Sequence, residues 1–137
     1  RGVAVGTEES RSVVQRWLEL AGTGDIDGAF ALFADDAVWS NIGTTRYSGD
    51  FKGRDEILGR LIGPLFTQLD GGISSEVEAV IADGERVVVL SRGSAVTREG
   101  TSYNNTYAQV FTVRDGRIVA VREYMDTALV DRVFGTA

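Results

Sequence analysis

Residues 103–125 read YNNTYAQVFTVRDGRIVAVREYM, two runs of β-branched and aromatic residues on either side of Asp115-Gly116. An Asp-Gly pair between two such runs is a strong signal for a tight β-hairpin. Two further runs precede this hairpin and end in similar glycine turns: 74–82 with Asp83-Gly84, and 86–97 with Glu99-Gly100. The second half of the chain therefore predicts a meander of four long antiparallel strands.

Outward from this meander, the period of the apolar residues changes from strand-like to helical. Thr7 and Asp25 are candidate N-caps, and Pro64 predicts a kink or a break in the third helix. Asp126 is expected to cap a short final helix. The expected elements outside the meander are helices at 8–20, 25–34, 53–69 and 127–134, a short strand at 37–42 and a loop at 43–51.

This order of elements predicts an α+β fold, in which a curved antiparallel sheet wraps around three N-terminal helices. Such a cone encloses a cavity that suits a small molecule. We expect one domain at 8–135, and residues 1–7 to be a disordered segment or a remnant of cloning.

Composition narrows the classes of function. Lys and Arg number 14 against 20 Asp and Glu, a net charge of −6, which argues against nucleic acid or an anionic membrane as the partner. Cys and His are absent, so thiolate chemistry and the commonest metal ligand are excluded. No apolar run is long enough for a transmembrane helix. We expect a cytoplasmic protein that uses no metal and no cofactor.

Every second side chain of a strand points to the same face of the sheet. We expect the interior face to carry Arg92 and Ser94 from one strand, and Glu123 and Met125 from the last. The strand between them adds three polar side chains, Asn105, Tyr107 and Gln109. An isolated buried charge costs several kcal/mol, so an interior Arg and Glu must pair. The sequence therefore predicts an Arg92–Glu123 pair inside the cone.

Six blocks of sequence carry a resemblance to a known superfamily: VQRW (14–17), GDIDG (24–28), LFADDAV (32–38), YNNTYAQVF (103–111), DGRIV (115–119) and REYMD (122–126). Over about residues 8–135, the chain resembles the nuclear transport factor 2-like cone fold. Within that superfamily it is similar to the SnoaL-like and ketosteroid-isomerase-like branch. The fold hosts isomerases, cyclases, epoxide hydrolases and non-catalytic binders, so the resemblance implies a fold and not one reaction.

Ketosteroid isomerases use an Asp as base, and a Tyr with a protonated Asp to hold the substrate oxygen. The resemblance places these residues at Asn41, at Trp17, and at Tyr107 or Ala108. Asn cannot accept a proton and Trp cannot titrate. All three roles are altered, which argues against steroid isomerisation by that mechanism.

The pattern of the limonene epoxide hydrolases is kept better. That family holds a water with Tyr, Asn and Asp, and an Arg bridges this Asp to a second Asp. The resemblance implies that Trp39-Ser40-Asn41 keeps the Asn, and that Arg92-Gly93-Ser94 keeps the Arg without the second acid. Glu123 stands at the position of the Asp that activates water.

These considerations give each candidate a role. Glu123 is the general base with Arg92 as its partner, Asn41 orients a water, and Tyr107 is the best candidate for a general acid. The alternatives are a structural Arg92–Glu123 ion pair and a hydrogen-bonded pocket tyrosine at Tyr107. Substrate contacts are expected from Trp39, Trp17, Ser94, Asn105, Gln109 and Met125. Residues such as Trp17 and Trp39 belong to the core more often than to a ligand platform, and Trp39 is the one expected nearer the pocket.

We therefore expect a cofactor-free enzyme that opens epoxides, cyclises or isomerises an apolar or ring-containing small molecule. The alternative is a binding protein of the same fold that catalyses nothing. The outer face of the sheet is expected to carry Ala108, Val110, Ile118 and Ala120. An apolar outer face needs covering, so a homodimer through the sheet is expected.

Overall fold

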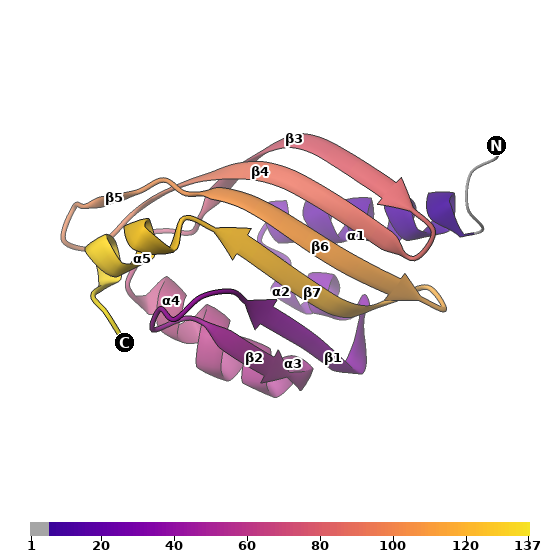
Figure 1. Cartoon of the computed structure of the whole chain (residues 1–137), viewed down its shortest axis with the longest axis horizontal. Helices are drawn as coiled ribbons and strands as arrows, with labels where there is room; N and C mark the ends of the chain where they lie inside the picture. Colours follow the sequence, from indigo (N-terminus) through magenta and orange to yellow (C-terminus); the bar gives the residue numbers. More distant parts are fainter. Residues whose placement is uncertain (1–5) are drawn as a thin grey trace.

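The structure is a computed structural model that describes residues 6–137, in which one curved sheet has helices against its concave side (Figure 1). The strands are β1 (Phe33–Asn41), β2 (Gly49–Lys52), β3 (Ser74–Asp83), β4 (Arg86–Val96), β5 (Ser102–Tyr103), β6 (Thr106–Arg114) and β7 (Arg117–Met125). The helical segments are α1 (Thr7–Gly22), α2 (Ile26–Phe30), α3 (Gly53–Glu56), η1 (Ile57–Ile62), α4 (Gly63–Thr67) and α5 (Thr127–Phe134). The expected α+β class is confirmed.

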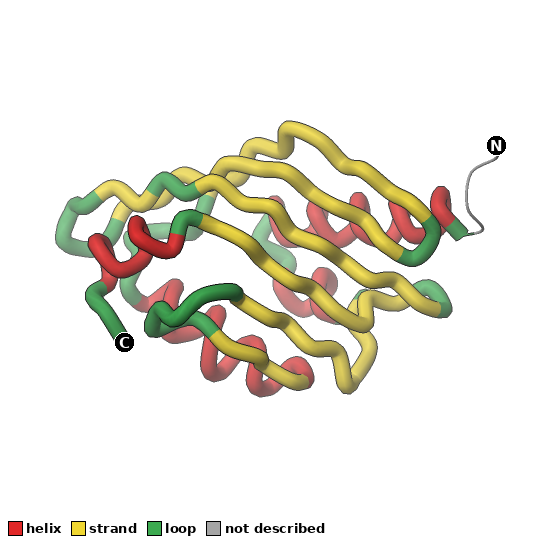
Figure 2. The backbone as a smooth tube through the Cα atoms, in the orientation of Figure 1, coloured by secondary structure: helices red, strands yellow, loops and turns green. Residues whose placement is uncertain are grey.

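The sheet has the strand order β2-β1-β7-β6-β4-β3, and β5 pairs with β4 outside this path. β3, β4, β6 and β7 form the predicted antiparallel meander, which Figure 2 shows as long neighbouring strands. β1 lies parallel to β7, so a strand from the start of the chain is placed beside the last one.

One row of side chains across four strands fixes which face of the sheet is internal. Val87, Phe111, Val121 and Trp39 are register neighbours on β4, β6, β7 and β1. None of them is more than 4% exposed. α1 covers this row, because the ring of Trp17 lies 5.3 Å from that of Phe111 and 6.0 Å from that of Trp39.

The third predicted helix is divided into three segments. α3 leads into η1, which is a π-helix, and α4 follows it with Pro64 in its first turn. Pro64 has no N–H to donate to the preceding turn. The predicted helix is therefore interrupted by a π-helical segment just before Pro64.

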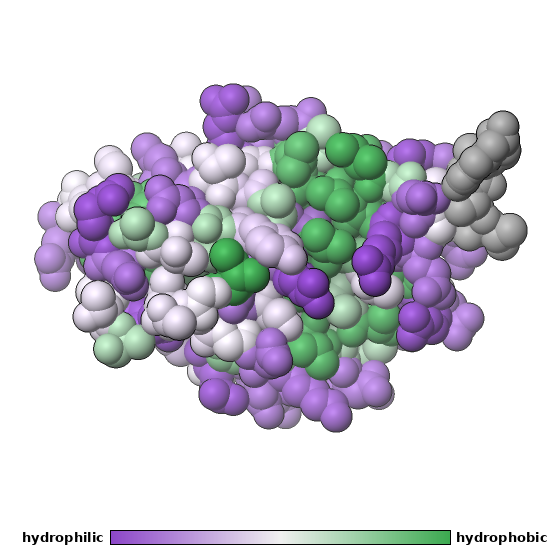
Figure 3. All heavy atoms as spheres, in the orientation of Figure 1, coloured by the Kyte–Doolittle hydropathy of each residue, from purple (hydrophilic) through white to green (hydrophobic). Residues whose placement is uncertain are grey.

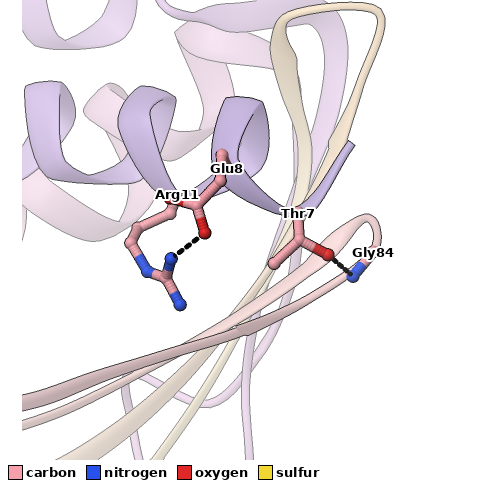
Figure 4. A network of polar contacts seen from close by, with 4 residues as sticks. All are labelled: Thr7, Glu8, Arg11 and Gly84. Atoms are coloured by element: carbon pink, nitrogen blue, oxygen red, sulfur yellow. Dashed lines mark hydrogen bonds and ion pairs between the residues drawn. The ribbon is translucent and has the colours of Figure 1, made fainter. Parts of the chain in front are cut away.

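Thr7 belongs to the folded unit, contrary to the expected start at residue 8. It is the first residue of α1, it is buried, and its side chain does not cap the helix. Its hydroxyl oxygen accepts a hydrogen bond of 2.8 Å from the N–H of Gly84, which fastens α1 to the β3–β4 hairpin (Figure 4). Glu8 and Arg11 form an ion pair within the first turns of α1. Residues 1–5 of the expected terminal segment lie outside the described residues.

Two capping predictions are confirmed and one strand was missed. The carboxylate of Asp25 accepts the N–H of Gly28, and that of Asp126 accepts the N–H of Leu129. β2 lies in the predicted loop and pairs with the end of β1. Only Phe51 of this short edge strand is buried, so it shows no alternation that sequence analysis could find.

The outer face of the sheet carries an apolar patch. Figure 3 shows it to the right of centre, over the meander, on the face opposite α1 and α2 in Figure 1. We define the outer patch by its residues: Ala79, Ile81, Val88, Leu90, Ala108, Val110 and Ala120. Ile118 was wrongly expected there. The register shifts between Thr112 and Val113, so Ile118 pairs with Val113 and is fully buried.

No helix among the described residues is both long and apolar enough to cross a membrane.

Candidate functional site

A polar row lies on the inner face of the sheet, next to the buried row of Trp39, Val121, Phe111 and Val87. Two residues further along the strands, Asn41 pairs with Glu123 across β1 and β7, and Glu123 pairs with Gln109 across β7 and β6. Val89 of β4 completes the row. Because side chains alternate, this row points to the same side as the buried one.

Glu123 is the ionisable group of this row. The amide Nε2 of Gln109 donates a hydrogen bond of 2.8 Å to its Oε1. No other hydrogen bond or ion pair reaches the carboxyl from the described residues, so Oε2 has no protein partner. Burial raises the pKa of Glu123 to about 7, and the Gln109 hydrogen bond opposes this rise only in part.

Side chains close the interior at the buried row of Trp39, Val121, Phe111 and Val87, whereas the polar row next to it is accessible. Asn41, Glu123 and Gln109 all keep some accessible surface, whereas the neighbouring row is closed by Trp17 and the other aromatic rings. Tyr107 and Met125, the pair one step further toward the end of β7, also keep accessible surface. The accessible part of this face therefore lies at the Glu123 end of the cone.

Asn41 is held by its own neighbours. The indole Nε1 of Trp39 donates to its Oδ1 at 2.9 Å, and its Nδ2 donates to the carbonyl oxygen of Tyr47 at 2.9 Å. Asn41 makes no hydrogen bond with Glu123, although the two residues are paired across the strands. One N–H of the Asn41 amide is left for another partner.

A second polar cluster continues along the inner face. The hydroxyl of Tyr107 donates to that of Tyr103 at 3.4 Å, and Nδ2 of Asn105 donates to the same oxygen at 3.2 Å. Asn105 also donates to the carbonyl of Asp126 and accepts its backbone N–H, so its amide fastens β6 to the start of α5. Burial raises the pKa of both tyrosines, and the charge of Glu123 adds to the rise.

The predicted Arg92–Glu123 pair is wrong. Arg92 lies on the outer side of the sheet, where its Nε donates to Glu78 at 2.8 Å and its side chain is 66% exposed. Ser94 of the same strand is also exposed on that side. The inner positions of β4 are those of Val87, Val89, Ser91, Gly93 and Ala95. Residues 87–90 are all apolar, so alternation did not distinguish the two faces.

Gly93 was the signal that could have fixed the face of β4. A Cβ atom at this position would lie 2.9 Å from Cε2 of Tyr107 and 2.8 Å from Cγ2 of Ile73. A glycine inside a strand often marks the close approach of another group. Here it lets the ring of Tyr107 lie over β4, which brings the Tyr107 hydroxyl to Tyr103.

Trp17 and Trp39 belong to the core. They pack with Phe33 and Phe111, and the indole N–H of Trp17 is buried with no acceptor among the described residues. Met125 is partly accessible and lies opposite Tyr107. Of the predicted substrate contacts, Gln109 and Met125 therefore lie with Glu123, and Asn105 lies with the tyrosines.

Two of the surface hollows in the described part of the chain are not lined by Glu123. One, of about 370 Å³, is lined by Glu78, Leu90, Ser91, Thr106, Tyr107, Ala108, Tyr124 and Met125. The other, of about 310 Å³, is lined by Asp70, Gly72, Ser94, Ala95, Val96 and Asn104. The large cone cavity expected from the sequence is not among them.

Comparison with known proteins adds the family. Residues 14–121 match the model of the SnoaL-like domain, which is most of the chain. The chain belongs to the SnoaL-like domain family. No curated protein matches it.

Solved structures place this SnoaL-like domain in the fold that was expected. Bal32a from a soil-derived mobile gene cassette is 26% identical, with a TM-score of 0.82 over 92% of this chain and 96% of that one. An NTF2-like protein of unknown function from Burkholderia pseudomallei is 24% identical, with a TM-score of 0.82 over 91% and 96%. A Mycobacterium tuberculosis LEH-like epoxide hydrolase is 25% identical, with a TM-score of 0.69 over 92% and 89%. The nuclear transport factor 2-like fold is thereby confirmed.

The chemistry available to this SnoaL-like domain centres on one carboxyl group. A carboxyl with a pKa about 7 is populated in both protonation states at neutral pH, as a group that takes and returns a proton must be. No ionisable side chain in the described part of the chain forms an ion pair with it. The arrangement suits the transfer of a proton by Glu123 alone.

Proposed function

We propose that this SnoaL-like domain is a small-molecule enzyme that performs cofactor-free acid–base chemistry on an apolar substrate at Glu123. The observation that carries the proposal is the buried Glu123 carboxyl, whose pKa is about 7 and whose second oxygen has no protein partner in the described chain. A base with one free oxygen can contact a C–H bond or a water molecule directly.

Among the expected reactions, isomerisation or cyclisation by proton transfer fits these residues better than epoxide opening. Epoxide hydrolysis needs a base for the water and an acid for the leaving oxygen. Arg92 lies on the outer side of the sheet, and no second carboxyl accompanies Glu123 in the described residues. Proton transfer from carbon and back to carbon needs only one carboxyl group, which is first the base and then the acid.

The decisive experiment compares Glu123→Gln with Glu78→Gln. Glu78 is an exposed carboxyl on the outer side of the sheet, so its substitution controls for the loss of one negative charge. Both variants and the unchanged protein are assayed on a panel of enolisable ketones and epoxides. The proposal expects turnover to disappear in Glu123→Gln and to remain in Glu78→Gln. Unchanged turnover in a folded Glu123→Gln protein would remove Glu123 from the chemistry.

The second candidate is a binding protein without turnover. The observation that favours it is the same lack of a second acid or a guanidinium beside Glu123 within residues 6–137. A thermal-shift screen with product detection on the same panel separates the two. Stabilisation by a compound that is never converted would support the binder.

We also propose that the outer patch binds a second copy of the chain. The four-strand face that carries the patch measures roughly 20 Å by 30 Å, about 600 Å², somewhat less than the ~800 Å² that each partner of a standard interface buries. The centre of the patch is apolar, Arg92 and Glu78 at its side form an ion pair, and the exposed Arg122 of β7 lies beside Val110. The proposal therefore rests on the apolar centre of the patch.

A further inference from the structure

The carboxyl group of Glu123 has one oxygen that a molecule from outside can reach. Oε1 accepts the hydrogen bond from Gln109, whereas Oε2 has no partner among the described residues. The side-chain atoms of the described chain that are both buried and unpartnered are Nε1 of Trp17 and Oδ1 of Asp131, and Oε2 is not one of them. Oε2 is therefore an accessible acceptor on a side chain that is otherwise buried.

The protein supplies no cation to this carboxyl within residues 6–137. Arg122, its neighbour on β7, is exposed on the outer face of the sheet, and Arg92 pairs with Glu78 on that same face. A buried carboxylate is normally paired with a cation or held by several hydrogen bonds, because an isolated buried charge is costly. Glu123 has a single hydrogen bond from a neutral amide, so a cation from outside would complete its interactions.

A second open acceptor lies beside the first. Nε2 of Gln109 donates to Glu123, which leaves Oε1 of the Gln109 amide without a partner in the described chain. This oxygen is not among the buried unpartnered atoms either. Gln109 and Glu123 are paired across β6 and β7, and the Cβ atoms of such a pair lie about 5 Å apart. A primary ammonium group has three hydrogens to donate and no acceptor, so its chemistry matches two neighbouring acceptors.

The surroundings of these two oxygens favour a cation that carries an apolar body. Tyr107 and Met125, the next pair along β6 and β7, keep accessible surface on the same side of the sheet. An aromatic ring attracts a nearby cation, and a methionine side chain adapts to an irregular apolar shape. The net charge of −6 also favours the approach of cations over anions.

We propose that Glu123 and Gln109 form a binding site for an apolar primary amine, which binds as its ammonium cation. The ammonium group donates to Oε2 of Glu123 and to Oε1 of Gln109, and its apolar body lies along Tyr107 and Met125. This inference goes beyond the proposed function, because it requires an accessible carboxylate and no turnover.

The test compares the binding of 2-aminotetralin with that of tetralin, which has the same two rings without the amine. Isothermal titration calorimetry is carried out at pH 8, where an aliphatic amine is a cation and most Glu123 carboxyl groups are ionised. The unchanged protein is expected to bind the amine about tenfold more tightly, the contribution of one hydrogen bond between charged groups. Glu123→Gln is expected to lose this preference.

Glu78→Gln is the matched control, because it removes an exposed carboxyl from the outer side of the sheet. It should keep the preference for the amine. Circular dichroism checks that both variants fold.

The same comparison at pH 5.5 tests the site without any substitution. Glu123 is then mostly protonated, because burial raises its pKa to about 7, whereas a carboxyl with the usual value of 4.5 stays charged. The ionisable side chains that interact with Glu123 are Tyr103 and Tyr107, whose pKa values are raised, so both stay neutral at pH 5.5 and pH 8. The preference for the amine should therefore be lost at pH 5.5.

Four results would overturn the inference. They are equal binding of the two compounds by the unchanged protein at pH 8, no measurable binding of either, a preference that survives in folded Glu123→Gln, and a preference that persists at pH 5.5. Equal loss of the preference in Glu78→Gln would belong with them, because it would assign the effect to the net charge of the protein.

Turnover by the unchanged protein separates this inference from the proposed function. It is measured without amine on the ketones and epoxides named above, and includes the exchange of deuterium from heavy water into the ketones. A preference for the amine without turnover of any compound would contradict the proposed catalysis and leave the amine site standing. Turnover that depends on Glu123, together with equal binding of amine and tetralin, would refute only the amine site.

Discussion

Gln109 and Glu123 face each other across β6 and β7, and the amide of the first donates a 2.8 Å hydrogen bond to the carboxyl of the second. Two opposite influences meet in this pair. Burial disfavours the charged carboxylate and raises the pKa, whereas the amide stabilises the carboxylate and lowers it. Burial is the larger, and the resulting pKa of about 7 places Glu123 at the midpoint of its titration near neutral pH.

Removal of the amide shifts this balance further. In Gln109→Leu, the carboxylate loses its hydrogen bond and keeps its burial, so the pKa of Glu123 is expected to rise above 7. If Glu123 acts as a base, the rise of kcat/KM with pH moves to higher pH by about one unit, as expected for the loss of one hydrogen bond. The measurement is the pH profile of turnover, or of deuterium exchange, on an active ketone.

Gln68→Leu serves as the control, because Gln68 is exposed and lies just after α4, away from the Glu123 row. Its profile should match that of the unchanged protein. A Gln109→Leu profile that stays in place would mean that the hydrogen bond does not govern the titration of Glu123.

The raised pKa of Glu123 also predicts how stability depends on pH. The folded protein holds this proton up to about pH 7, whereas the unfolded chain releases it near the usual value of 4.5. Between these values the folded state binds more protons, so the free energy of unfolding falls as pH rises. The loss amounts to about 3 kcal/mol for this group, from roughly 1.4 kcal/mol for each pKa unit. Glu123→Gln carries no such proton and escapes the loss.

Urea denaturation at pH 5 and pH 8 measures this effect. Glu123→Gln should gain stability relative to the unchanged protein between the two values, and Glu78→Gln should not. The difference between the profiles is the informative quantity, because other carboxyl groups change both proteins alike. Parallel profiles for Glu123→Gln and the unchanged protein would contradict the buried, proton-binding state of Glu123.

The fold could be predicted from the sequence because its signals were local. The Asp-Gly turns, the long β-branched runs and the capping carboxylates of Asp25 and Asp126 each determine a structure within a few residues. On β6 and β7, alternation placed Tyr107, Gln109 and Glu123 on the inner face. It succeeded there because these polar groups alternate on the same face as the buried Phe111 and Val121.

The site was predicted less well because its geometry depends on contacts between distant segments. On β4, four apolar residues in a row left the inner face undetermined. Arg92 was placed on the inner face because it was expected to pair with Glu123, whereas it lies on the outer side and pairs with Glu78. Near Ile118, a shifted register reversed the alternation. The contacts of Asn105 with Asp126 unite β6 with the start of α5, and they depend on the packing of segments that are far apart in the sequence.

Gly93 tests the packing that brings Tyr107 to Tyr103. In Gly93→Ala, the new Cβ would lie 2.8 Å from Cγ2 of Ile73 and 2.9 Å from Cε2 of Tyr107, so both side chains must move. Overpacking of this kind costs about 1–3 kcal/mol of stability. Gly22→Ala is the control, because Gly22 ends α1 and no atom lies within 4 Å of its added Cβ. It should leave stability unchanged or raise it, by up to ~1 kcal/mol. Equal stability of the two variants in urea would contradict the close approach of Tyr107.

The outer patch provides the last prediction, on assembly. Ile81 on β3 is 55% exposed. Ala79, two residues before it on the same strand, pairs with Leu90 of β4. If two copies bury this patch against each other, a charge at its centre is left unpaired in the dimer and solvated in the monomer. Leu90→Lys should therefore weaken the dimer strongly, by a factor of 100 or more, since an unpaired buried charge costs about 3 kcal/mol or more.

Sedimentation equilibrium over a range of protein concentrations measures this change. Ile26→Lys is the matched control, because Ile26 is also an exposed apolar residue, 37% exposed, but lies on α2 behind the sheet (Figure 1). A dimer that dissociates in Leu90→Lys and persists in Ile26→Lys locates the interface on the outer patch. If the unchanged protein is a monomer, the proposed dimer is refuted. If Leu90→Lys does not change the dissociation constant of the dimer, the interface lies elsewhere. Neither result would bear on the proposed role of Glu123, because the polar row lies on the opposite face of the sheet.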